Sequence, residues 1–109
     1  MGHILALVDW SEAPIDTHII SSLQNHYPNY QLLQPLTHVF LLVSGNAQHT
    51  TNDNVHVLFN GYIDNSVPDN QTNAQYILNQ YREHNHNFAA KIIGHFACII
   101  WDEIGRAHV

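Results

Sequence analysis

The segment that most constrains the fold is residues 95–102 (HFACIIWD), because it is apolar at nearly every position. A strand with one solvated face alternates apolar and polar side chains, whereas a strand covered on both faces is apolar almost throughout. We therefore predict a sheet that is covered by a second sheet on one face and by helices on the other.

Three other segments are predicted to be strands. Residues 4–10 (ILALVDW) are a short apolar run, residues 37–43 (THVFLLV) stop at a turn signal in 44–46, and residues 55–60 (VHVLFN) are closed by an Asn-Gly pair. Residues 46–54 are polar, residues 62–71 are the most loop-like stretch, and residues 107–109 look like the opening of another strand after a turn at 104–106.

The helical pattern begins near residue 72. Ala74, Ile77, Leu78 and Tyr81 follow the spacing of an amphipathic helix, and Thr72 with a Gln three residues later predicts a capping box. A second helical piece is expected over 87–93, and residues 11–30 are read as one short helix and a loop.

The composition limits the class of protein. A chain of 109 residues makes one domain, and its formal net charge is −6 because nine acids face three bases, Arg82, Lys91 and Arg106. Nucleic acids and anionic membranes are therefore not expected partners. The sequence has no secretion signal and no apolar run of about 20 residues, so we expect a cytoplasmic protein.

Two segments resemble the glutaminase domain of asparagine synthetase and related class II amidotransferases. Residues 55–65 (VHVLFNGYIDN) are similar to the family's strand followed by Asn-Gly-Glu-Ile-Tyr-Asn. Residues 75–102 are similar to the family's helix and the strand after it, and the Gly-x-Phe-Ala-x-x-x-Trp-Asp pattern that starts at Gly94 is the most specific part. With the opening strand, the resemblance covers about two thirds of the chain.

This resemblance implies an α+β fold, an αββα Ntn-hydrolase-like sandwich of two mostly antiparallel sheets. The family domain continues for several further strands, so residues 1–109 are expected to form a single, partial domain, the N-terminal part of the whole. Such a part exposes strand edges, and we expect self-association or a continuation that covers them.

The catalytic residues of the family are missing. Its nucleophile is a cysteine exposed by removal of Met1, whereas here that position is Gly2. The one thiol, Cys98, lies inside an apolar strand and is expected to be buried. The resemblance therefore leaves this chain with no catalytic residue.

The family's substrate-binding charges are also absent. Its arginine for the glutamine carboxylate corresponds to Phe40, and its aspartate for the ammonium group corresponds to Asn73. Asn60 and Gly61 match the family's oxyanion hole, and the resemblance implies that they are a remnant of it. The alternative is that the Asn-Gly pair only ends a strand in a turn. Tyr62 stands where the family usually has Glu.

Other kinds of site have weaker support. Ten histidines raise the possibility of a metal site, with His84 and His86 as the closest pair, but their spacing matches no zinc pattern and surface histidines are expected. No G-x-S-x-G motif is present to support a Ser-His-Asp triad.

The resemblance therefore implies a degenerate glutaminase-like domain, a pseudoenzyme that acts as a scaffold. Degenerate front domains of this kind occur in β-lactam synthetases and lasso peptide cyclases, amide-forming ligases in which an adenylating domain does the chemistry. No cofactor is expected in this chain, and ATP and Mg would be used only by an adenylating domain outside it. The partner would be that domain or a second copy of the chain. The alternatives are a live amidotransferase domain that has lost its N-terminal Cys and a small self-associating interaction protein.

Overall fold

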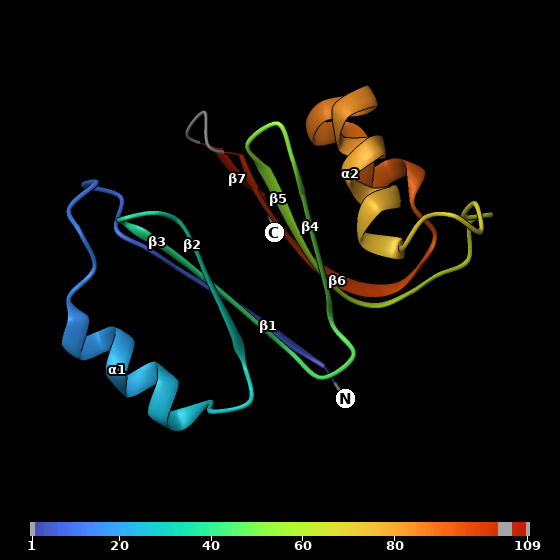
Figure 1. The fold of residues 1–109 in the computed structure, drawn as a ribbon. Helices are drawn as coiled ribbons and strands as arrows, with labels where there is room; N and C mark the ends of the chain where they lie inside the picture. The colour runs from blue at the N-terminus through green and yellow to red at the C-terminus, as the bar shows by residue number, and fades with distance from the viewer. Residues whose placement is uncertain (1, 103–105, 109) are drawn as a thin grey trace.

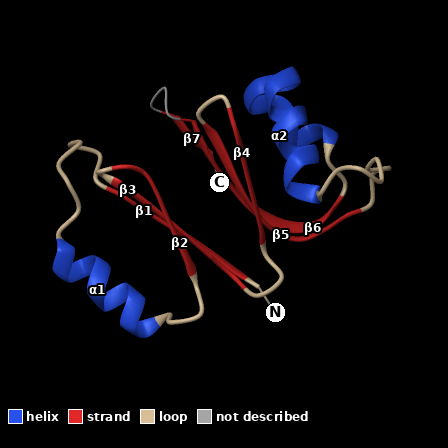
Figure 2. Cartoon of the chain, viewed as in Figure 1, coloured by secondary structure: helices blue, strands red, loops and turns tan. Residues whose placement is uncertain are grey.

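The computed structural model describes residues 2–102 and 106–108, which form an α+β fold of two antiparallel sheets and two α-helices (Figures 1 and 2). This confirms the predicted α+β class. The elements are β1 His3–Val8, α1 Thr17–His26, β2 Gln31–Leu36, β3 Val39–Ser44, β4 Gln48–Asn52, β5 Val55–Ile63, α2 Asn73–His84, the 3-10 helix η1 Asn85–Lys91, β6 Gly94–Asp102 and β7 Arg106–His108.

The strands are divided between a three-stranded sheet, in the order β1-β3-β2, and a four-stranded sheet, in the order β4-β5-β6-β7. The longest ladder joins β5 to β6, with pairs running from Val55 with Asp102 to Ile63 with Gly94. The apolar segment 95–102 is thus an interior strand with a neighbour on each side, as its composition predicts.

The two sheets share one apolar core. Val39, Leu41 and Val43 alternate onto one face of β3 and cluster with Leu58 of β5 and Trp101 of β6. These residues come from different sheets, so the sheets are packed face to face. The expectation that a second sheet covers one face is confirmed.

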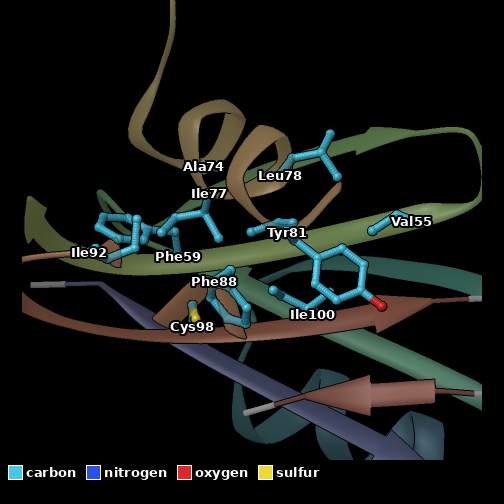
Figure 3. Packing of buried hydrophobic residues seen from close by; sticks show 11 residues of the cluster. Val55, Phe59, Ala74, Ile77, Leu78, Tyr81, Phe88, Ile92, Cys98 and Ile100 are labelled. Carbon is cyan, nitrogen blue, oxygen red and sulfur yellow. The ribbon is translucent and has the colours of Figure 1, made fainter. Parts of the chain in front are cut away.

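The helix α2 covers the other face of the four-stranded sheet. Ala74, Ile77, Leu78 and Tyr81 are buried against the sheet together with Phe88 and Cys98, as Figure 3 shows. The predicted capping box is also present: the Thr72 amide donates to Gln75 Oε1 at 2.8 Å, and the Gln75 amide donates to Thr72 Oγ1 at 3.2 Å.

The helix α1 lies on the side of the three-stranded sheet that faces away from the four-stranded sheet (Figure 1). Phe40 and Leu42 are only 2% and 1% exposed and point to this side, because they alternate with the residues of the shared core. The layers therefore follow the order α1, sheet, sheet, α2.

Several element boundaries differ from the sequence predictions. Residues 48–52, predicted as part of a polar connection, form β4, and residues 31–36, which had no assignment, form β2. The strand predicted to end at Asn60-Gly61 runs on to Ile63. The predicted turn at 104–106 lies mostly outside the described residues.

None of the helices described over residues 2–102 and 106–108 has the length and apolar character needed to cross a membrane.

Candidate functional site

The structure brings together Gly2 and Asn60, two of the positions identified by the sequence. The Asn60 side chain has the same orientation on β5 as Leu58, so it points toward the three-stranded sheet. There Asn60 Nδ2 donates a hydrogen bond to the Gly2 carbonyl oxygen at 2.8 Å. In Figure 1 the start of β1 lies beside the connection between β3 and β4, which contains Ala47.

Gly2 is buried and leaves no room for a side chain. A Cβ placed on Gly2 would lie 2.5 Å from the Ala47 backbone nitrogen, 2.9 Å from Ala47 Cβ and 2.9 Å from Asn60 Oδ1. These distances are shorter than van der Waals contact, and the first involves backbone. Any residue other than glycine at this position therefore requires β1 or the β3-β4 connection to move.

Gly61 is required by the close approach of β6. It has a φ of 128°, and a Cβ there would lie 2.3 Å from the His95 carbonyl oxygen and 2.6 Å from Phe96 Cα. The strand continues through Gly61, so the prediction of a strand-ending turn is wrong. The requirement for glycine comes from packing within the β5-β6 ladder.

Phe40 lies away from the contact between Gly2 and Asn60. It pairs with Leu7, which is five positions along β1 from Gly2, a separation of roughly 16 Å in an extended strand. Its side chain also points toward α1 rather than into the shared core. The structure thus does not bring this position to the candidate site.

Asn73 is the first residue of α2, which is anchored next to the same end of β5. The amide of the following residue, Ala74, donates to Gln48 Oε1 at 2.9 Å, and Gln48 pairs with Phe59, the neighbour of Asn60. The anchor lies on the α2 face of the sheet, opposite the face that carries the Asn60 side chain.

No described Lys or Arg side chain lies near Gly2 and Asn60. The sequence has no Lys or Arg before Arg82, and Arg82 Nη2 is 3.2 Å from Asp53 Oδ2 at the β4-β5 turn, at the other end of β5. A glutamine carboxylate at the candidate site would therefore lack a cationic partner from the described side chains.

Cys98 is buried among the residues that pack against α2, as predicted. Burial raises the pKa of the Cys98 thiol to about 11, so the thiol is protonated near neutral pH. A buried, protonated thiol is a poor nucleophile.

The side chain of His86, from the predicted pair with His84, lies outside the described residues. Among the residues that are described, no group of three or more His, Cys, Asp or Glu side chains could hold a metal ion. Sequence reasoning missed a different pair, His49 and His56, whose rings face each other across the β4-β5 hairpin. Predicting the β4-β5 hairpin from the sequence would have revealed this pair, but the polar composition of residues 46–54 did not indicate a strand.

A scan of protein-family models and searches of curated proteins and of solved structures returned no match to this chain.

Proposed function

We propose that this chain is a catalytically degenerate glutaminase-like domain that serves as a scaffold in an asparagine-synthetase-type, amide-forming ligase. The observation that carries the proposal is the contact between Gly2 and Asn60. It joins the position that would hold a nucleophile to the position that would hold an oxyanion donor, and it fills the space between them with a hydrogen bond.

The contact supports a scaffold because both positions already have structural roles. An N-terminal nucleophile needs a side chain that projects toward the substrate carbonyl, and Gly2 has neither a side chain nor space for one. An oxyanion donor must point at the reacting oxygen, whereas Asn60 Nδ2 donates to the Gly2 carbonyl.

The lack of charged side chains at the substrate-binding positions also supports a scaffold. Glutamine is a zwitterion, and a site that binds it offers a cation to its carboxylate and an anion to its ammonium group. Phe40 and Asn73 are neutral, and Phe40 is buried on another face of the fold. The chemistry of the parent enzyme would then belong to an adenylating domain outside this chain, which would use ATP and Mg.

A glutaminase assay combined with covalent labelling tests the proposal. The chain is incubated with glutamine and, separately, with a diazoketone analogue of glutamine that alkylates N-terminal nucleophiles, and ammonia and intact mass are measured. We expect background ammonia and no mass increase, while an active glutaminase domain run in parallel gives both signals. Ammonia release at an enzyme-like rate, or an adduct near residue 2, would support the live amidotransferase instead.

The Asn60→Ala variant separates a structural role from a catalytic one. Its loss of the bond to Gly2 should lower the free energy of unfolding by about 1 kcal/mol. The control is Asn79→Ala on the exposed face of α2, which should change it by less than about 0.5 kcal/mol. Equal stability of the two variants would remove the structural role of Asn60.

The second candidate, a self-associating interaction protein, is favoured by a specific surface. β1 is an edge strand, and Trp10 just after it is 70% exposed. Trp10 lines two hollows of about 420 and 400 Å³, both of which include Leu7 and Val8. Exposed strand edges and apolar hollows are common in interfaces.

Light scattering after size exclusion tests this second candidate. If copies associate through this edge, Trp10→Ser should shift the population toward a 12.4 kDa monomer. Ile93→Ser removes a similarly exposed apolar side chain, 66% exposed, that lines neither hollow and should leave the population unchanged. A monomer at all concentrations would exclude self-association.

A further inference from the structure

The strand β1 has one edge without a partner strand, and a hollow lies on each side of the sheet along it. Among residues 2–102 and 106–108, β1 pairs with β3 alone. The backbone N–H and C=O groups on its other side, the β1 edge, are therefore available to pair with another extended chain.

The inner hollow, of about 400 Å³, lies on the face of β1 that is turned toward the four-stranded sheet. Its lining is apolar throughout and includes Ile99 and Trp101 of β6. Ala6 also faces this side, because it pairs with Leu41 of the shared core. Nevertheless Ala6 is exposed and Ile99 is only half-buried. A part of the apolar core is thus left uncovered beside the β1 edge.

The outer hollow, of about 420 Å³, lies on the opposite face, between β1 and the segment that leads into α1 (Figure 1). Its apolar lining includes Leu7 and Ile19, and Trp10, which is 70% exposed, borders both hollows. The outer hollow differs from the inner one in its charge, because Asp9 and Asp16 also line it.

Both carboxylates of the outer hollow are fixed by hydrogen bonds from the chain. The hydroxyl and the amide of Ser11 donate to Asp9 Oδ1, and the amide two residues after Asp16 donates to its Oδ1 at 2.7 Å. The bonds from Ser11 lower the pKa of the Asp9 carboxyl, so it is ionised near neutral pH. Among the described side chains, neither carboxylate has a Lys or Arg partner, and the sequence has no such residue before Arg82.

We propose that the β1 edge binds an extended basic segment of another protein, in which apolar residues alternate with Lys or Arg. Neighbouring side chains of an added strand point to opposite faces, so they enter the two hollows in turn. An apolar side chain matches the lining of the inner hollow. A Lys or Arg side chain in the outer hollow places its charge beside Asp9 and Asp16 and stacks on the ring of Trp10.

A second copy of the chain is a poorer match for this edge. Its own β1 (HILALV) contains no Lys or Arg, so it brings no permanent cation to the outer hollow. Two copies that each carry a formal net charge of −6 also repel each other. The binding of a basic segment does not involve Gly2 or Asn60, so it is independent of whether the domain is a degenerate glutaminase.

A peptide titration followed by NMR tests the proposal. The probe is a peptide of alternating Val and Lys, as long as β1 and blocked at both ends. We expect saturable shifts of the β1 amides and of the indole N–H groups of Trp10 and Trp101, the two tryptophans of the chain, below about 1 mM peptide. A Val-Glu peptide should not bind, and a peptide with the same Val and Lys residues in separate blocks should bind more weakly. No saturable shift with the Val-Lys peptide, or equal binding of all three peptides, would overturn the proposal.

The double variant Asp9→Asn, Asp16→Asn tests the outer hollow. It should weaken binding of the Val-Lys peptide by about threefold to tenfold at low salt. The asparagine oxygens still accept the local hydrogen bonds, so the fold should be retained. The matched control Asp64→Asn, Asp69→Asn removes the same charge from exposed positions outside both hollows and should leave binding nearly unchanged. Equal losses in the two double variants would mean general charge attraction and would contradict the proposed site.

Adding unlabelled chain to labelled chain tests the competing occupant. We expect no shifts of the β1 amides at the concentrations at which the Val-Lys peptide binds. If the unlabelled chain causes the same shifts at those concentrations, the β1 edge binds a second copy and the proposal is wrong.

Discussion

At the scale of single residues, Gly2 is the position on which the proposed scaffold role most depends. An alanine at this position adds one methyl group against the Ala47 backbone nitrogen, which cannot rotate away. Overpacking of this kind costs about 1–3 kcal/mol. We expect Gly2→Ala to lower the free energy of unfolding by that amount, measured by urea denaturation.

The control for Gly2→Ala is the double variant with Asn60→Ala. Removing Asn60 opens only one side of the space, so part of the clash with Ala47 should remain and the two effects should not add. If Gly2→Ala alone is as stable as the parent, position 2 accommodates a side chain and the scaffold interpretation loses its basis.

Cys98 gives a prediction about pH. Burial raises the pKa of its thiol from 9.0 to about 11, so the folded state favours the protonated thiol. The unfolded chain therefore releases the thiol proton at a lower pH than the folded chain. The stabilisation that comes from keeping the thiol protonated in the folded state is complete below about pH 9 and is lost as the pH rises toward 11.

We therefore expect the free energy of unfolding of the parent to fall more steeply than that of Cys98→Ala between about pH 8 and about pH 10.5. The cavity left by alanine lowers stability at every pH, and only the difference in slope reports the thiol. Parallel slopes would mean that the thiol titrates normally in the folded chain.

At the scale of elements, the two α-helices differ in how firmly they are held. α2 buries Ala74, Ile77, Leu78 and Tyr81, whereas α1 has no fully buried residue, and its Ile19 is 49% exposed. An element with few buried contacts opens at a lower free energy than the rest of the fold.

We expect the amide hydrogens of α1 to exchange with solvent more rapidly than those of α2, as measured by native-state hydrogen exchange. The amide of Ile77 in α2 should be among the most protected, and the amide of Leu23 in α1 should be among the least protected of the helical amides. Equal protection of both helices would mean that α1 is held by interactions stronger than its burial indicates.

The accuracy of the sequence predictions also varies by element, and for physical reasons. β6 was predictable because a strand that is buried on both faces is apolar at nearly every position. α2 was predictable because a helix that is buried along one side has apolar residues at a helical spacing. β4 (QHTTN) was not, because its side chains are polar and its pairing with β5 comes from the tight Asp53-Asn54 turn. β2 contains Pro35, which is tolerated because β2 is an edge strand, but which weakens any strand pattern.

At the scale of the whole molecule, the stacking of two sheets was predictable from the apolar strands, but the assembly of the candidate site was not. Gly2 and Asn60 are 58 residues apart in the chain, and only the packing of β1 against β5 brings them together. The resemblance marked both positions without indicating that they bond to each other. Phe40 was marked in the same way, yet the register of β1 with β3 places it far from Gly2.

The central claim is that the space around residue 2 is closed to a nucleophile and lacks the charges that hold glutamine. The most direct measurement is the rate of ammonia release from glutamine by Gly2→Cys, after mass spectrometry has shown that Met1 is removed. The account predicts background release, because the thiol cannot be seated beside Asn60 and no described cation lies nearby. Turnover on the order of 1 per second, within the usual range for enzymes, would contradict it.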